Sequence, residues 1–270
     1  MTGVQTCALP ISFITAGGPE ATSAVAFPFG SSVVSLEGAA VAMVNEGCRR
    51  IARLGTPNGG DSFQKGLASK GVELLFDALT PSDPAPVIAA LVARNVDCLY
   101  IGGAEASIRN VILAADQAGR SFRYAWLGEF VSTNAMALLG PSIDNALIIS
   151  NTPIGFDTTD PTVRQFRSEL DQYYPGQKYA NGLAPWGNVD LLIQVMKTID
   201  GDINAPSVLN ALRGFKGNTK LYGPVDLTKE RANKAYQRLF VANAFVYHVV
   251  NAKPVRFGEP LNLSALLDAN

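Results

Sequence analysis

The chain has 270 residues, 47% of them hydrophobic, which is enough to bury one large core or two smaller ones. Lysine and arginine total 22 against 23 acidic residues, so there is no basic surplus to neutralise a phosphate backbone, and nucleic acid is excluded as a partner. The apolar runs are too short to span a bilayer. We therefore expect a two-lobed protein that does not cross a membrane.

The three cysteines and the single histidine, His248, do not have the spacing of metal ligands, so we expect no metal and no cofactor. Cys48 and Cys98 each stand at the start of a predicted strand, and their sulfurs could approach one another if those strands are neighbours. The sequence favours two unpaired, buried thiols.

The first residues, MTGVQTCALPIS, lack the charged start and apolar stretch of a secretory signal. They are similar to a translated sequencing adapter fused to a gene fragment. We set residues 1–11 apart as a foreign or disordered segment.

Beyond that segment, short apolar runs alternate with amphipathic stretches, which is the pattern of βα units on a parallel sheet. The expected strands span residues 12–15, 50–55, 72–76, 97–102, 122–127 and 145–150. The tail at 236–250 and 253–257 has no helical period and predicts further strands. The fold class is α/β, with doubly wound parallel sheets.

The helices between these strands are indicated by apolar stripes and start signals. Asp160 and Pro161 predict an N-cap and a first helical turn. Three stripes are expected to pack on the core: Val87, Ile88, Leu91 and Val92; Ile108, Val111, Ile112 and Ala115; and Val189, Leu192, Ile193 and Met196.

Five loops follow the predicted strands, at 15–18, 55–61, 102–105, 128–130 and 150–153. Ligands of doubly wound sheets gather at the carboxyl ends of the strands, where glycine lets backbone amides approach closely. The sequence therefore predicts a ligand cleft bordered by these loops.

Signatures of enzymes are absent or broken: there is no GxGxxG after a strand, no GxxxxGK[ST] and no HExxH. The run from Gly60 to Gln64 approximates the GxSxG nucleophile elbow around Ser62, but Gln64 breaks the motif, and His248 falls in a predicted strand. We expect no enzyme, with a Ser–His hydrolase as a remote alternative.

The stretches RIARLG at 50–55, DCLYIGG at 97–103, WLGE at 126–129 and LYGPVD at 221–226 occur in a familiar order. Here the chain resembles the type I periplasmic solute-binding proteins of the branched-chain amino-acid (Leu/Ile/Val) ABC transporter family. The resemblance implies two α/β lobes joined by three crossovers, with a solute closed between them.

Residues 12–30 and 151–227 would form the first lobe, 31–150 and 228–260 the second, and 261–270 a tail. The family's opening βα units have no counterpart, so we expect an N-terminally truncated fragment with an incomplete first lobe and exposed apolar faces on its helices.

The resemblance also implies roles for individual residues. Thr15, Gly17 and Gly18 would receive a ligand carboxylate, and Glu129 would receive an α-ammonium group. Trp186 would stand at the start of a helix near the cleft.

Asn58 and Ala104 occupy positions where the family's amino-acid binders place aromatic side chains, so a roomier or wetter pocket is expected. The implied function is that of the solute-binding component of an ABC importer, taking an amino acid, amide or carboxylate. Its partner would be the transporter permease, and the full-length protein would be periplasmic or otherwise extracytoplasmic. An effector-binding sensor of the same fold is the alternative.

Overall fold

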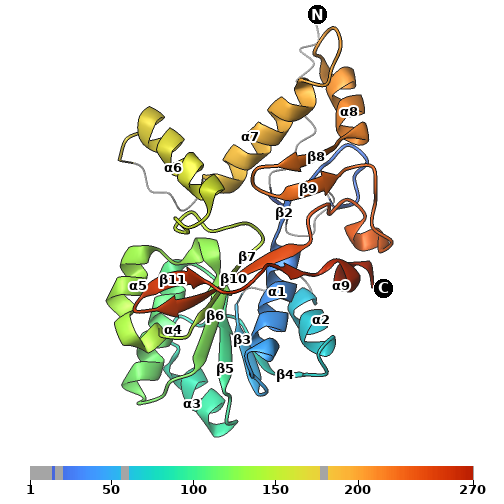
Figure 1. Cartoon of the computed structure of the whole chain (residues 1–270). Helices are drawn as coiled ribbons and strands as arrows, with labels where there is room; N and C mark the ends of the chain where they lie inside the picture. Colours follow the sequence, from blue (N-terminus) through green and yellow to red (C-terminus); the bar gives the residue numbers. More distant parts are fainter. Residues whose placement is uncertain (1–13, 16–20, 56–60, 177–181, 270) are drawn as a thin grey trace, which may run out of the picture.

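A computed structural model describes residues 14–15, 21–55, 61–176 and 182–269. Figure 1 shows a lower body built on one large sheet and an upper group of helices with a hairpin. The segments that join them meet beside the carboxyl ends of the central strands. None of the helices in the described part of the chain has the length and apolar character needed to span a bilayer.

The large sheet has the strand order β11-β10-β7-β6-β5-β3-β4, with β12 paired to β10. Strands β4, β3, β5, β6 and β7 run parallel, whereas β10 is antiparallel to β7, and β11 and β12 are antiparallel to β10. The bounds are β3 Ile51–Leu54, β4 Leu74–Ala78, β5 Cys98–Ile101, β6 Arg123–Leu127, β7 Leu147–Ser150, β10 Asn243–Val250, β11 Lys253–Arg256 and β12 Leu261–Asn262. The predicted strands in this region are confirmed, except that residues 236–242 precede β10 and are not part of a strand.

Helices cover both faces of this sheet (Figure 1). Side chains of one strand alternate between faces, so Cys98 and Tyr100 join one core while Leu99 and Ile101 join the other. The first core is covered by α1 (Ser32–Asn45) and α2 (Ser62–Ala68), with α9 (Ser264–Asp268) at its margin. The second is covered by α3 (Ala85–Ala93), α4 (Glu105–Gln117), α5 (Thr133–Leu139) and the short 3-10 turn η3 (Gly140–Ile143).

Helix α1 is enclosed on nearly all sides. Ser31 caps it by accepting a hydrogen bond from the Val33 amide at 3.2 Å. A Cβ atom on Gly38 would lie 2.5 Å from the Cβ of Ala244, and one on Gly66 would lie 2.7 Å from the Cβ of Ala40. These two glycines let α1 approach both β10 and α2 closely.

The upper group contains α6 (Pro161–Tyr173), α7 (Leu183–Met196), α8 (Ala205–Gly214) and the antiparallel hairpin of β8 (Lys216–Thr219) and β9 (Gly223–Asp226). The short parallel pair β1 (Ile14–Thr15) and β2 (Gly30–Ser31) leads from this region into α1. The predicted cap of α6 is confirmed, because the Asp160 carboxylate accepts from the amides of Thr162 and Val163. A third core joins these elements.

The predicted inward stripe of α7 is wrong for two of its members. Val189 and Ile193 are 49% and 42% exposed, whereas Leu191 and Val195 are buried. The packed face is set by Gly187, where a Cβ atom would lie only 2.4 Å from Leu221 Cδ2. The hairpin packs against α7 at Gly187, and Val189 and Ile193 give this helix the exposed apolar face that was expected for the first lobe.

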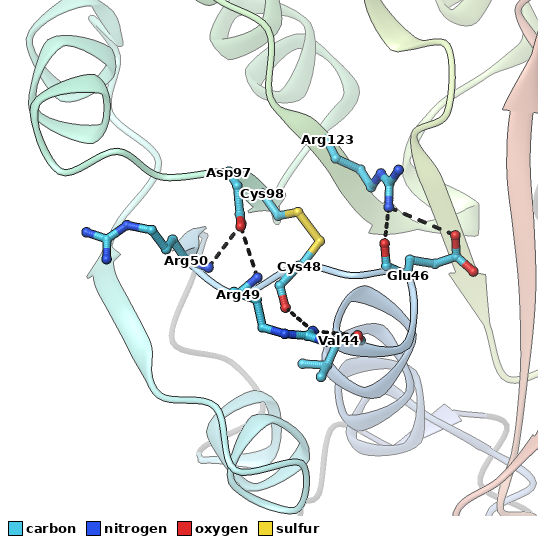
Figure 2. The surroundings of a disulfide bond; sticks show 8 residues. All are labelled: Val44, Glu46, Cys48, Arg49, Arg50, Asp97, Cys98 and Arg123. Carbon is cyan, nitrogen blue, oxygen red and sulfur yellow. Dashed lines mark hydrogen bonds and ion pairs between the residues drawn. A yellow bond between two sulfur atoms is a disulfide. The ribbon is translucent and has the colours of Figure 1, made fainter.

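The expectation of two unpaired thiols is also wrong. Cys48 and Cys98 form a disulfide with a Cα–Cα distance of 5.8 Å, as Figure 2 shows, because β3 and β5 are neighbours. Asp97 closes the same corner by accepting from the amides of Arg49 and Arg50 at 3.0 and 3.1 Å. The two sulfurs and Asp97 lie close together, but bonded sulfurs are not thiolate metal ligands.

Candidate functional site

A pocket lies where the upper group meets the carboxyl ends of β6 and β7. Its volume is about 410 Å³, within the range of small-molecule sites. The start of α1, the segments that follow β6 and β7, and the first turn of α7 form its walls. They contribute Ser31, Ser32, Ser35, Leu127, Gly128, Phe130, Ser150, Asn151, Thr152, Pro153, Ile154, Gly155, Phe156, Leu183, Ala184 and Pro185.

The polar wall is the start of α1. The first amides of a helix have no intrahelical acceptors and carry a partial positive charge, which favours an anionic group. Ser31 and Ser35 line this wall and are 3% and 4% exposed. The Ser32 hydroxyl is buried and has no hydrogen-bond partner within the described chain. This wall can therefore donate hydrogen bonds to an acceptor in the pocket.

The opposite walls are apolar. Leu127, Ile154 and Leu183 are buried there, and Phe130 is 40% exposed at the edge. Gly128 lets Ile154 pack closely against the end of β6, because a Cβ atom at that position would lie 2.6 Å from Ile154 Cγ2. No charged side chain occurs among the described lining residues. These apolar walls suit the aliphatic or aromatic part of a ligand, opposite the polar wall at the start of α1.

Hydrogen bonds from β10 hold the wall that follows β7. The amide of Ile154 donates to the Tyr247 hydroxyl at 3.2 Å, and that hydroxyl donates to the Asp157 carboxylate at 3.1 Å. Burial raises the pKa of Tyr247, and the negative charge of Asp157 raises it further. Asn151 joins the same wall to the segment before β2, because its Nδ2 donates to the Phe29 carbonyl at 3.4 Å.

Replacing Tyr247 with phenylalanine is expected to lower the free energy of unfolding by about 1–3 kcal/mol, because it leaves the buried amide of Ile154 and the Oδ2 atom of Asp157 without their partner. Guanidinium denaturation measures the change. Tyr173→Phe, at a side chain that is 69% exposed, is the matched control. Equal losses in the two variants would contradict this role of Tyr247.

The predicted site residues differ in whether the structure describes them and whether they lie near the pocket. Gly17, Gly18 and Asn58 lie outside the described residues. Thr15 is in β1 and pairs in register with Ser31, so its backbone adjoins the polar wall. Ala104 precedes α4 at the carboxyl end of β5 and is not among the lining residues.

Glu129 and Trp186 are each next to lining residues in the chain. Glu129 belongs to the 3-10 turn η2 (Gly128–Phe130), whose two other residues line the pocket. Trp186 follows Pro185 but donates from Nε1 to Glu169 at 2.7 Å, and its ring packs against Phe166. This hydrogen bond is the main cause of the lowered pKa of Glu169. Ligand contact by Glu129 or Trp186 stays a prediction.

The expected loops 128–130 and 150–153 do border the pocket, whereas Gly102–Gly103 and the described ends of loop 55–61 do not line it. The serines at the start of α1 were not predicted. Their signal is Gly30-Ser31-Ser32 before an apolar run, a pattern typical of a helix N-terminus.

Within the described residues, Ser62 and His248 do not form the catalytic pair that the hydrolase alternative requires. The buried Ser62 hydroxyl has no hydrogen-bond partner within the described chain. His248 Nε2 lies 3.6 Å from Glu46 Oε2, and its ring packs on Phe257 with centroids 4.4 Å apart. His248 therefore does not activate Ser62 in this arrangement.

The sheet, the upper group and the pocket between them agree with a match to a family model described as "Periplasmic binding protein", which covers residues 9–245. The chain belongs to the periplasmic binding protein family. The resemblance to periplasmic binding proteins inferred from the sequence is thereby confirmed, as is the α/β fold class.

Solved structures share the fold of this periplasmic binding protein. A branched-chain amino-acid ABC transporter protein from Thermus thermophilus with bound valine has a TM-score of 0.69 and 14% identity, covering 90% of this chain and 68% of that one. An ABC transporter solute-binding protein from Rhodopseudomonas palustris HaA2 in complex with p-hydroxybenzoic acid has a TM-score of 0.72 and 15% identity, covering 94% and 72%. A benzoate complex from R. palustris has a TM-score of 0.69 and 15% identity, covering 93% and 71%. Among curated proteins, none matches the chain.

Proposed function

We propose that the chain binds a small carboxylate-bearing solute in the pocket at the start of α1 and releases it unchanged. The observation that carries this proposal is the buried Ser32 hydroxyl, which has no partner in the described chain and lies at the positive end of a 14-residue helix. A carboxylate would accept hydrogen bonds from this wall. The aliphatic or aromatic body of the solute would lie against Leu127, Ile154 and Leu183.

The bound molecules of the similar structures support the chemical class. Valine, benzoate and p-hydroxybenzoic acid each combine a carboxyl group with an apolar body. The family supports a role as the solute-binding component of an ABC importer, which delivers its ligand to a permease outside the cytoplasm. The Cys48–Cys98 disulfide fits such an oxidising compartment.

Calorimetric titration with valine, benzoate and p-hydroxybenzoate tests the proposal. Ser32→Ala is expected to weaken binding of the preferred acid on the order of tenfold, the usual effect of losing one hydrogen bond to a charged acceptor. Ser121→Ala, on the exposed turn before β6, should leave the affinity unchanged. Absence of binding by every carboxylate, or equal affinities in the two variants, would refute the site.

Substitution of Glu129 distinguishes an amino-acid ligand from an aromatic acid without an amine. If the solute is an amino acid, Glu129→Ala is expected to weaken its binding by about 2–5 kcal/mol, because a buried ammonium group would lose its counter-charge. If the solute is an aromatic acid without an amine, the same change should leave its affinity close to that of the unmodified protein. Parallel titrations with valine and benzoate measure both outcomes.

A further inference from the structure

A second cavity lies beside Arg238, in the connection between β9 and β10. This arginine precedes β10 and is only 5% exposed. Its guanidinium group rests over the rings of Phe27 and Phe240, 4.4 and 4.8 Å from their centroids. Nε donates to the Ala26 carbonyl at 3.2 Å, and Nη1 donates to Glu230 Oε1 at 3.1 Å.

The remaining nitrogen of Arg238, Nη2, is buried and has no hydrogen-bond partner within the described chain. A buried, charged donor without an acceptor is unfavourable unless a ligand or water supplies one. Burial lowers the pKa of Arg238, although the hydrogen bond to Glu230 and the negative charge of Glu230 oppose the shift. The guanidinium group therefore has one carboxylate partner, Glu230, and one nitrogen left without an acceptor in the described chain.

Arg213 brings a second guanidinium group to the same cavity. It belongs to the last turn of α8, and its one hydrogen bond to the described chain runs from Nη2 to the Ala24 carbonyl at a long 3.4 Å. Glu230 is the only carboxylate among the described lining residues, and it already accepts from Arg238 and from Gln237. Two cations thus share one anion.

The cavity between them has a volume of about 420 Å³, and Ala24, Leu227 and Thr228 form the rest of its wall. That space holds more than a single inorganic ion. The described lining residues have no member in common with the pocket at the start of α1.

We propose that this cavity is a second binding site, which takes a small organic oxyanion, a carboxylate or a phosphate, between Arg213 and Arg238. Guanidinium groups bind both oxyanions through paired N–H donors, and both arginines line this cavity. A ligand here would link the segment that precedes β2 to the connection between β9 and β10 (Figure 1).

Titration calorimetry at constant ionic strength tests the site, with inorganic phosphate and acetate as separate arms and chloride as the background anion. We expect saturable binding of at least one anion. The anion with the higher affinity, phosphate or acetate, identifies the class of oxyanion that the site prefers. Arg213→Gln, at an exposed side chain, should weaken it by about tenfold or more. Arg120→Gln removes the same charge from an exposed turn elsewhere and should have no effect. Arg238→Lys keeps the charge but loses the planar fork, and should also weaken binding.

Ser32→Ala separates this site from the pocket at the start of α1, and anion binding here should survive it. Loss of the anion in Ser32→Ala would assign the anion to the other pocket and overturn the proposal. Failure of both anions to bind, or equal affinities in Arg213→Gln and Arg120→Gln, would overturn it as well. Circular dichroism of each variant verifies that the fold is retained.

Discussion

Replacing both Cys48 and Cys98 with alanine is expected to lower the free energy of unfolding by about 4 kcal/mol, through the greater chain entropy of the unfolded state. The bond joins positions 50 residues apart, and it fixes the carboxyl end of α1 to the amino end of β5. Both sulfurs are buried, so their loss also leaves a small space in the core between α1 and the sheet.

Chemical denaturation with and without a phosphine reductant measures this effect. The unmodified protein should lose stability when the reductant is added, whereas the double alanine variant should be insensitive to it. Similar stability of the two proteins under oxidising conditions would contradict a stabilising bond. The neighbouring hydrogen bonds of Asp97 and Arg49 would then be sufficient to hold this corner, which Figure 2 shows.

The protein is expected to lose about 3 kcal/mol of stability between roughly pH 4.5 and pH 7 because of Glu37 alone. Glu37 is fully buried in α1, and neither carboxylate oxygen has a hydrogen-bond partner within the described chain. Burial raises its pKa from 4.5 to about 7, although Lys65 and Arg231 oppose the shift. Between those values the folded chain keeps a proton that the unfolded chain has released, so the free energy of unfolding falls as the pH rises.

Glu37→Gln removes this dependence without changing the shape of the side chain. The variant should match the unmodified protein near pH 4.5 and exceed its stability by about 3 kcal/mol near pH 8. Glu73→Gln, at an exposed position before β4, is the control and should follow the unmodified protein across the range. A Glu37→Gln variant that is less stable near pH 8 would show that the carboxylate has a partner the structure does not reveal.

The parallel strands could be predicted from sequence because each is a short apolar run bounded by turn residues. Helix α1 was not predicted, since its side chains are buried on nearly every side and show no stripe. The sequence of α7 does contain an apolar stripe, but the side of the helix that packs is the one where Gly187 lies against Leu221. The disulfide required the neighbouring positions of β3 and β5, which spacing along the chain does not reveal.

The candidate site was predictable in its general place and less so in its residues. The rule that ligands gather at the carboxyl ends of parallel strands located the loops after β6 and β7. Ser32 and Ser35 belong to the helix that lacked a sequence signal, and Leu183 reaches the pocket from a distant part of the chain. Arg213 and Arg238 stand far apart in sequence and come together only through the fold.

The position of β10 in the sheet has a consequence for how the protein is made. Strand β7 ends at Ser150, and the strand that covers its edge begins at Asn243, after the whole upper group has been synthesised. Until then β7 presents unpaired backbone groups, as any sheet edge does. Pairing of segments this distant in the chain is slow. The lower body therefore cannot complete its folding on the ribosome while the upper group is still being translated, and its nascent forms are the ones most exposed to aggregation.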